Sequence, residues 1–249
     1  MLCLQKMKHQ IDYSETIDGL EYTIVTEDYF KPVLDLFFDV FVKGRKILPT
    51  SNYILIIFLL DEPIQKSIGT YPKRLPKVQD MVLDILKDGT SLMVIDPSNN
   101  NKVVGLRLAF TVTRDQVEPK LGYEKYRKEF DFAWSVIWDI TDQTTHPSNI
   151  FEKYPDVTKI YDMFCLCTHH DYRGKGLGTE MVKQSWKMAK KAGCNASAVW
   201  ASSNYSRKIF VNLGMITMHQ IQWDDLIYEG EIAFKNVDSD CITSHFIKL

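Results

Sequence analysis

The segment that most constrains this chain runs from residue 159 to residue 192. An apolar run, Lys159–Thr168, is followed by the turn sequence HHDYRGKGLGT and by the helical pattern Thr179–Ala192. Glycines in the turn let the backbone bend sharply and bring N–H groups close to a ligand. The start of the helix adds unpaired N–H groups and the positive end of the helix dipole. The segment therefore predicts a phosphate-binding site over Arg173–Thr179.

Three interpretations compete for this turn. A Walker loop needs Gly-Lys-Ser/Thr after its spacer, which is absent. A dinucleotide site needs a glycine where Thr179 stands, and an acid about 20 residues later for the ribose. No Asp or Glu lies between Met181 and Trp223; the stretch instead contains Lys183, Lys187, Lys190, Lys191, Arg207 and Lys208. This basic surface suits a ligand with several phosphates, such as coenzyme A. The alternative is a glycine-rich turn before a solvated lysine face.

Length and composition exclude several classes of protein. The chain has 249 residues and a formal net charge of -2, so it can bury one large core and lacks the basic surface of a nucleic-acid-binding protein. Its longest apolar run, Tyr53–Leu60, is far shorter than the roughly 20 residues of a spanning helix. Residues 1–18 lack the apolar core of a signal peptide. Five scattered cysteines are typical of reduced thiols. We expect a cytoplasmic monomer with no membrane or nucleic-acid partner.

The remaining periodicity indicates an α+β (mixed α/β) chain. We expect an N-terminal extension over residues 1–19 and a single domain over residues 20–249. Period-2 or apolar runs predict strands, and apolar residues at helical spacing predict helices. The predicted strands are Leu20–Thr26, Ser91–Ile95, Lys102–Thr113, Lys159–Thr168, Ala196–Trp200, Met215–Trp223, Glu231–Lys235 and Ile242–Ile247, and the predicted helices are Tyr29–Val42, Leu75–Lys87, Thr179–Ala192 and Asn204–Leu213. Residues 121–149 show no clear pattern.

Several short motifs resemble one known family. The run RGKGLG at 173–178 fits the Arg/Gln-x-x-Gly-x-Gly/Ala signature of the GNAT acyltransferases. The chain also resembles the insect arylalkylamine (dopamine-type) N-acetyltransferases over most of its length. The matching segments occur in the same order as in that family: Asp61-Glu62-Pro63, Asp171-Tyr172-Arg173-Gly174, Ser202-Ser203-Asn204-Tyr205-Ser206 and Gly230-Glu231-Ile232-Ala233-Phe234-Lys235.

The resemblance implies a GNAT fold, in which helices flank a twisted mixed sheet, and acetyl-CoA as co-substrate, without a metal. It also implies that a β-bulge splays two strands to admit the pantetheine arm, which pairs with the backbone of one of them. The residues that it assigns to the cofactor are Leu166, Cys167, Thr168, Arg173, Gly174, Lys175, Gly176, Leu177, Gly178, Thr179, Asn204 and Lys208.

The same resemblance assigns the catalytic groups. Glu62 matches the general base, which takes a proton from the amine substrate; the alternative is a surface acid that opens a turn before Pro63. Ser202 and Ser206 match serines near the base and the thiol, whereas Ser203 suits a helix N-cap. Many GNAT members carry a tyrosine as general acid where this chain has Phe210, which cannot donate a proton.

The acceptor is expected to be an arylalkylamine of the dopamine, tyramine, octopamine, serotonin or tryptamine class. The alternatives are agmatine or another aliphatic amine, a longer acyl donor, or a non-catalytic acyl-CoA-binding module. The aromatic residues Tyr123, Phe132, Trp134 and Trp138 are candidates for an amine pocket or for the core. Cys165-x-Cys167 and His169-His170 lack the spacing of a zinc site, so we expect no metal there.

Overall fold

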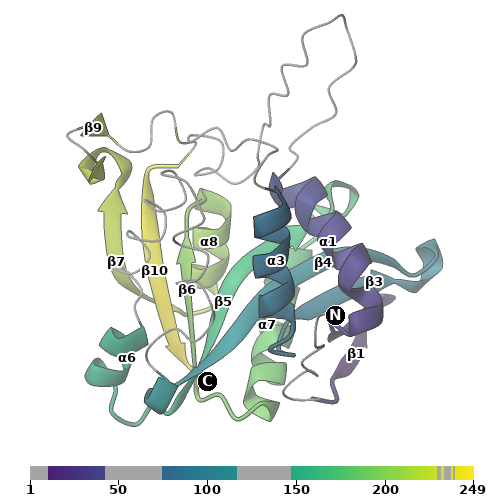
Figure 1. Ribbon diagram of the computed structural model, residues 1–249, viewed down its shortest axis with the longest axis horizontal. Coiled ribbons are helices and arrows are strands. Elements are labelled where there is room, and N and C mark those ends of the chain that lie inside the picture. The colour runs from purple at the N-terminus through teal and green to yellow at the C-terminus, as the bar shows by residue number, and fades with distance from the viewer. Residues whose placement is uncertain (1–10, 43–74, 117–146, 229–230, 233–236, 238) are drawn as a thin grey trace, which may run out of the picture.

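The computed structural model describes residues 11–42, 75–116, 147–228, 231–232, 237 and 239–249. An eight-stranded sheet dominates this part of the chain, with the strand order β1-β2-β3-β4-β5-β6-β10-β7 (Figure 1). Within that sheet only β5 and β6 pair in parallel, and the other neighbouring pairs are antiparallel. The mixed α/β fold predicted from the sequence is therefore confirmed.

The bounds of most elements lie close to those that periodicity predicts. The strands are β1 (Ser14–Ile17), β2 (Leu20–Ile24), β3 (Leu92–Asp96), β4 (Lys102–Thr113), β5 (Lys159–Thr168), β6 (Ala196–Ala201), β7 (Ile216–Gln222), β10 (Cys241–Lys248) and a separate pair, β8 (Ile227–Tyr228) and β9 (Glu231–Ile232). The helices are α1 (Phe30–Phe37), α3 (Leu75–Leu86), α6 (Pro147–Lys153), α7 (Leu177–Lys191) and α8 (Asn204–Asn212).

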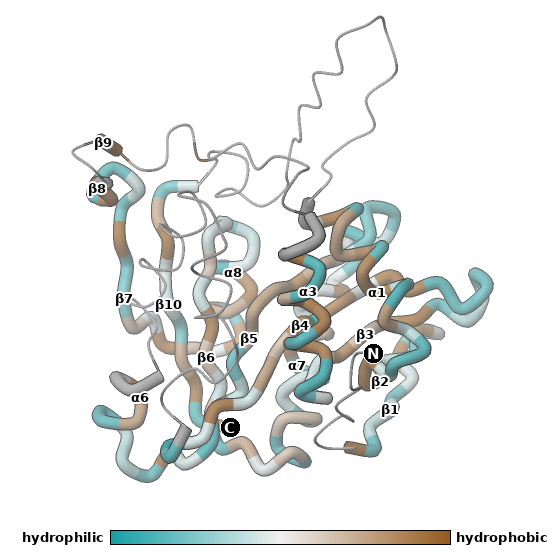
Figure 2. Tube along the Cα trace, in the orientation of Figure 1, coloured by the Kyte–Doolittle hydropathy of each residue, from teal (hydrophilic) through white to brown (hydrophobic). Residues whose placement is uncertain are grey.

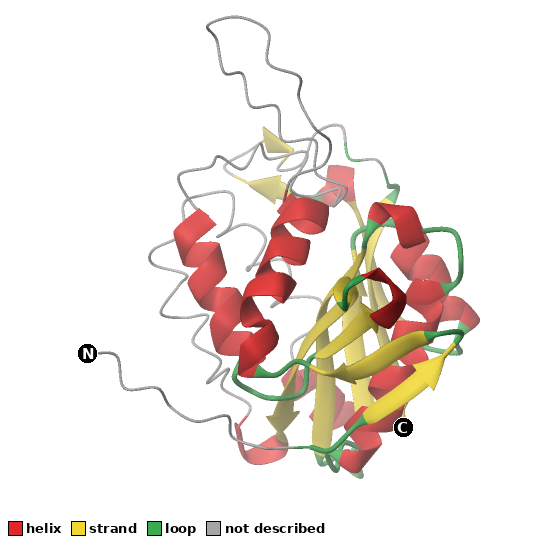
Figure 3. Ribbon diagram, turned by 90° about the vertical axis from the view of Figure 1, so that its right-hand side faces the viewer, coloured by secondary structure: helices red, strands yellow, loops and turns green. Residues whose placement is uncertain are grey.

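Helices cover both faces of the sheet (Figure 3). Helices α1 and α3 pack against β4 from one side, and α7 packs against β4 and β5 from the other. Helix α8 lies on the α7 side, since its Phe210 shares a buried cluster with Met181 and Val182 of α7. Strands β3 and β4 are buried on both faces, which explains their nearly continuous apolar sequences (Figure 2). The fold therefore has two cores, one on each face of the sheet.

Strand β5 contains an irregularity that the resemblance led us to expect. Its pairing with β4 shifts between the partners Leu108↔Cys165 and Ala109↔Met163, so Phe164 is the extra residue of a β-bulge. One extra residue reverses the side-chain alternation. Tyr161 and Met163 accordingly pack in the core on the α7 face, whereas Cys165 and Cys167 pack in the core on the α1 and α3 face.

The bulge coincides with the point where β5 leaves its other neighbour. The parallel pairing of β5 with β6 covers only Ile160–Met163 of β5, matched to Ala196–Val199 of β6. From Phe164 to Thr168 the strand pairs with β4 alone. The two central strands therefore splay apart beyond Met163, and in the described part of the chain one edge of β5 has no strand partner there.

Some elements were not predicted from the sequence. Strand β1 lies within the expected extension of residues 1–19 and pairs with β2, so part of that stretch contributes an edge strand. Helix α6 begins at Pro147, a favourable first position. Arg114, which follows β4, donates hydrogen bonds to the carbonyl of Phe151 near the end of this helix and to that of Tyr154 just after it. Residues 38–42, predicted as α-helix, form a wider π-helical turn after α1. In the described part of the chain no helix is long and apolar enough to span a membrane.

Candidate functional site

The glycine-rich turn after β5 needs its glycines for two different reasons. Gly174 and Gly176 have φ angles of +74° and +80°, which only glycine adopts at little cost. A Cβ atom on either would meet nothing within 4 Å, so the loop is open to a ligand. Gly178 is instead closely packed: its Cβ would lie 3.3 Å from Cδ1 of Ile209 and 3.6 Å from Cδ2 of Leu166. The first two glycines shape the turn and the third brings α7 close to β5.

Helix α7 begins two residues earlier than Thr179, the predicted start, and it presents free backbone donors. Its first backbone bond runs from the N–H of Glu180 to the carbonyl of Gly176. No side chain caps this end of the helix in the structure. The N–H groups of Leu177, Gly178 and Thr179 therefore have no partner within the helix, and they lie at the positive end of its dipole. Such an end is suited to bind a phosphate.

Contacts on both sides hold the turn in place. Arg173 Nε donates to the carbonyl of Thr168 at 3.1 Å, and Lys175 Nζ donates to the carbonyl of Asp171 at 3.0 Å. The hydroxyl of Tyr172 donates to Asp96 in the turn between β3 and β4, at 2.5 Å. Hydrogen bonds from Ser98 and from this tyrosine lower the pKa of Asp96. The predicted turn at Asp96–Asn101 therefore also positions the glycine-rich turn.

The open edge of β5 leads directly to this turn. The N–H of His169 donates to the carbonyl of Val104, so His169 faces β4 through its backbone. Because backbone groups alternate along a strand, those of Cys167 also face β4, while those of Leu166 and Thr168 face the splay. The predicted cofactor residues Leu166 and Thr168 thus have the required orientation. The backbone N–H and C=O groups of Cys167, which is also a predicted cofactor residue, instead belong to the ladder with β4.

Cys167 is also turned away from the splay through its side chain. The thiol is fully buried, 3.8 Å from the sulfur of Cys165, in the core under α1 and α3. The hydrogen bond with Cys165, together with burial, raises the pKa of Cys167 well above its usual value. This buried thiol therefore stays protonated at neutral pH.

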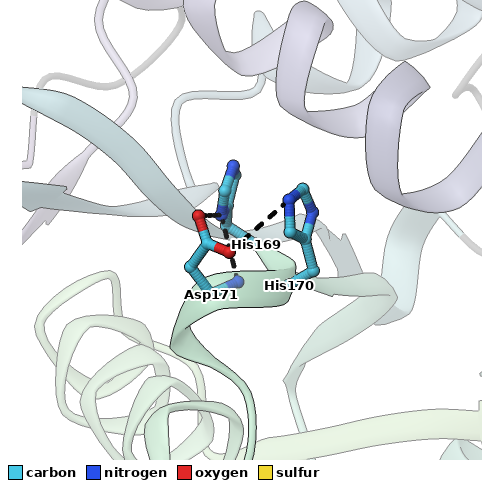
Figure 4. Close-up of side chains that lie close together, drawn as sticks. All are labelled: His169, His170 and Asp171. Carbon is cyan, nitrogen blue, oxygen red and sulfur yellow. Dashed lines mark hydrogen bonds and ion pairs between the residues drawn. The ribbon is translucent and has the colours of Figure 1, made fainter. Parts of the chain in front are cut away.

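Three polar side chains lie close together at the start of the turn (Figure 4). His169 and His170 stack at 4.1 Å between ring centroids, and Asp171 lies beside both. The side chain of His169 accepts a hydrogen bond from the N–H of Asp171 at Nδ1 and caps the short 3-10 helix His170–Tyr172. Burial lowers the pKa of His169. Because Nδ1 of His169 accepts this bond, the cluster holds the backbone of the turn in its conformation.

The serines that follow β6 separate into a cap and two candidates. The hydroxyl of Ser203 accepts from the N–H of Ser206 at 3.1 Å, so Ser203 is the N-cap of α8, as predicted. The hydroxyl of Ser206 lies 2.8 Å from that of Ser203 and 3.1 Å from its carbonyl. Ser202 is buried, and its carbonyl accepts from Ser239. The cofactor candidates Asn204 and Lys208 are exposed in the first turns of this helix, with Asn204 bound to Arg207.

A buried cation that was not predicted from the sequence lies beside the splay. Arg107 of β4 is 1% exposed, and its Nε and Nη2 atoms have no hydrogen-bond partner among the residues that the structure describes. Its guanidinium carbon lies 5.6 Å from the centre of the Phe210 ring. A cation–π contact contributes up to about 2 kcal/mol, whereas burying an unpaired ion costs several kcal/mol. Burial accordingly lowers the pKa of Arg107 to about 10. The signal was present in the sequence, as the only charged residue within VVGLRLAFTVT.

The rest of the predicted site falls on other parts of the chain. The proposed base Glu62 lies outside the described residues, as do the aromatic residues Tyr123, Phe132, Trp134 and Trp138. The structure brings together the predicted residues of the β5 edge, the turn and the start of α7. They lie where β5 ends, at one end of the sheet. Phe210 is buried beside Arg107.

Comparisons with known proteins agree with this geometry. Residues 100–215 match the Acetyltransferase (GNAT) family, a span that includes β5, the turn and α7. The structure resembles that of arylalkylamine N-acetyltransferase 2 from Aedes aegypti, with a TM-score of 0.76 at 22% identity over 93% of this chain and 99% of that one. A mosquito arylalkylamine N-acetyltransferase-like 5b has a TM-score of 0.70 at 19% identity, covering 92% of this chain and all of its own (100%).

A third similar structure has a different acceptor in its description. It is a Drosophila melanogaster polyamine N-acetyltransferase described as forming N-acetylagmatine, with a TM-score of 0.68 at 12% identity, covering 92% of this chain and 100% of that one. At such identities these likenesses establish the fold. The family match identifies a GNAT acetyltransferase domain over residues 100–215 of this chain.

Proposed function

We propose that this chain transfers the acetyl group of acetyl-CoA to the primary amine of an arylalkylamine. One observation supports this most strongly: the free N–H groups of α7 lie at the end of a strand edge that has no strand partner. A pyrophosphate at the turn would leave the pantetheine arm free to run along Leu166 and Thr168. The thioester would then reach the splay between β5 and β6.

The reaction requires three things of the protein. The amine arrives as an ammonium ion with a pKa of roughly 10 and must lose a proton, for which we propose Glu62 as general base. The thioester oxygen develops negative charge and needs fixed donors, such as backbone N–H groups at the bulge. The departing sulfur needs a proton or a positive charge, and we propose that Ser206, with Ser202 nearby, supplies a hydroxyl to it.

The acceptor class is the least constrained part of the proposal. The two mosquito proteins with this fold are described as acting on arylalkylamines or as similar to such enzymes, and the Drosophila protein as forming N-acetylagmatine. The segments that resemble the dopamine-type enzymes favour an arylalkylamine. An aliphatic amine is the second candidate, and a non-catalytic acyl-CoA-binding module is the third.

A panel of amines distinguishes these candidates. The full chain is incubated with acetyl-CoA and one amine at a time, and the released thiol is measured. We expect kcat/KM for dopamine, tyramine, octopamine, serotonin and tryptamine to exceed that for agmatine and the polyamines. The reverse order would replace the arylalkylamine by an aliphatic acceptor. Tight acetyl-CoA binding without thiol release for any amine would identify a binding module.

A further inference from the structure

We propose that Arg107 is a catalytic residue of this site, and that its guanidinium faces the sulfur of acetyl-CoA and stabilises the thiolate as the C–S bond breaks. The proposal rests on the acetyl transfer proposed above. The positive charge that the departing thiolate requires would then come from β4, which contains none of the short motifs shared with the arylalkylamine N-acetyltransferases.

The position of Arg107 in the sheet brings it to the splay. In the ladder between β4 and β5, Arg107 lies directly opposite Leu166, whose backbone faces the open edge. Its side chain is on the α7 and α8 face: a Cβ on Gly105, two residues earlier, would meet Met181 of α7, and the guanidinium itself lies against Phe210 of α8. The cation therefore lies beside both the strand edge proposed for the pantetheine arm and α8.

The neighbouring Phe210 suggests a chemical role for Arg107. By resemblance, Phe210 occupies the place where many GNAT enzymes carry a tyrosine that protonates the sulfur. A phenylalanine ring cannot donate a proton, but its face attracts a cation, and Arg107 occupies that face at 5.6 Å. The Arg107 cation therefore lies beside the position at which this chain lacks the tyrosine acid. A fixed positive charge can stabilise a thiolate without transferring a proton to it.

No ion pair neutralises Arg107 in the part of the chain that the structure describes. The titratable groups that act on it from β5 are Tyr161, Asp162, Cys165 and Cys167, and His245 of β10 lies on another side of Phe210. Burial raises the pKa of Tyr161, and the pKa of Cys167 is raised as well, so both stay neutral. Burial raises the pKa of Asp162 to about 7, so this carboxyl is an anion at the pH of the test below, in wild type and variants alike. Among the described residues no carboxylate forms an ion pair with Arg107, and Nε and Nη2 have no partner. A negatively charged group that enters the splay would supply one.

The step balances without a further reagent. The amine nitrogen, after losing a proton to the base, forms the N–C bond with the thioester carbon. The C–S bond breaks, its electron pair stays on sulfur, and the second amine proton passes from the nitrogen to water. Coenzyme A departs as a thiolate held by the Arg107 cation and takes a proton from water as it leaves; if this proton passes through the Ser206 hydroxyl, water returns one to the serine. Arg107 keeps all its protons throughout.

Binding of coenzyme A and of desulfo-coenzyme A, which lacks the sulfur, tests the role of Arg107. Affinities are measured by calorimetry between pH 7.5 and 9.5, where Arg107 remains largely charged and the side chain of His245, with a pKa of about 4, stays neutral. Free thiols of this kind have a pKa of roughly 8.5. We expect wild type to prefer coenzyme A by about tenfold or more at the upper pH, which corresponds to lowering the bound thiol pKa by about one.

The variant Arg107→Met should reduce that preference to within about twofold while leaving the affinity for desulfo-coenzyme A unchanged. Arg114→Met serves as the matched control, since Arg114 binds the carbonyls that end α6. It should lower the melting temperature and keep the preference. Arg107→Met should melt no lower than wild type, because it removes a buried charge without a partner.

Each outcome separates the two proposals. An unchanged preference in Arg107→Met would show that Arg107 only packs in the core. If that variant does not fold, the ultraviolet absorbance of the thiolate in wild type decides: a bound thiol that titrates at or above its free pKa would overturn the proposal. If wild type binds neither compound, the proposed acetyl-CoA site itself is wrong.

Discussion

His245 lies in the core between two threonine hydroxyls of neighbouring strands. Thr243 of β10 lies 2.8 Å from Nε2, and Thr217 of β7 lies 3.3 Å from Nδ1. Burial, together with the charge of Arg207, lowers the pKa of His245 to about 4. The folded state therefore holds this ring neutral at a pH where the unfolded chain would protonate it.

This lowered pKa predicts acid sensitivity. The stabilisation is complete above the unfolded pKa of about 6.5 and is lost as the pH falls toward 4. Between these values wild type should lose on the order of 2 kcal/mol more unfolding free energy than His245→Gln, after a discount for solvent screening. Urea unfolding at several pH values measures the difference.

Comparison of variants is necessary because another buried group acts in the opposite direction. Burial raises the pKa of Asp162 to about 7, so its contribution to stability falls as the pH rises. That contribution is common to wild type and His245→Gln and cancels between them. His219→Gln, on the exposed strand β7, is the control. Equal losses in wild type and His245→Gln would mean that His245 does not sense pH.

Glu62 carries the proposed general-base role on the strength of the resemblance alone. Glu62→Gln keeps the size of the side chain and removes its basicity. We expect kcat/KM to fall by about 10²–10⁴, the usual range for general-base catalysis, and the acidic limb of the pH–rate profile to disappear. If the variant retains that limb at a near-normal rate, another group or bulk water takes the proton.

At the scale of elements, two serines at the start of α8 are expected to have different roles, one in the stability of the helix and the other in catalysis. Ser203 caps the helix through the N–H of Ser206, so Ser203→Ala should lower the free energy of unfolding by about 1 kcal/mol. Ser206→Ala keeps the cap acceptor, and it should lower kcat by more than it raises KM for acetyl-CoA, because its contact strengthens as charge develops on sulfur. Chemical denaturation and steady-state kinetics measure the two effects.

Two results would contradict these predictions for Ser203 and Ser206. If Ser206→Ala weakens acetyl-CoA binding while kcat stays within about twofold, Ser206 only positions the cofactor. The thiolate would then depend on Arg107 and on water. If Ser203→Ala leaves the unfolding free energy unchanged, the capping bond does not stabilise α8.

At the scale of the whole molecule, acetyl-CoA should stabilise the native state by mass action. At a concentration a hundred times Kd the gain is about 2.7 kcal/mol. For a domain of this size that raises Tm by about 5–10 °C. Gly178→Glu should abolish the shift, because its side chain would be forced between Ile209 and Leu166 and would displace the start of α7, whose N–H groups we propose as the pyrophosphate site.

The control is Gly178→Ala, which adds only a Cβ atom. That atom would lie 3.3 Å from the flexible end of Ile209, which can move slightly, so most of the shift should remain. Differential scanning fluorimetry across an acetyl-CoA series measures all three proteins. A full shift in Gly178→Glu would place the phosphates elsewhere.

The local elements of this protein could be predicted from its sequence because their signals are local. The strand before the turn, the glycines at 174 and 176 and the helix after them depend on neighbouring residues, and each lies where predicted to within about two residues. The cap at Ser203 followed in the same way. Helix α6 was missed because its C-terminal partner, Arg114, comes from a distant part of the chain.

Only the tertiary structure decided which faces these elements present. The bulge at Phe164 turns Cys165 and Cys167 away from α7 and leaves Leu166 and Thr168 facing the splay. The positions of Arg107 beside Phe210 and of His245 between two threonines depend on strand registers and helix packing that join residues far apart in sequence. Local propensity predicts that a strand forms. It does not predict pairing register, and a shift of one residue exchanges the two faces of a strand.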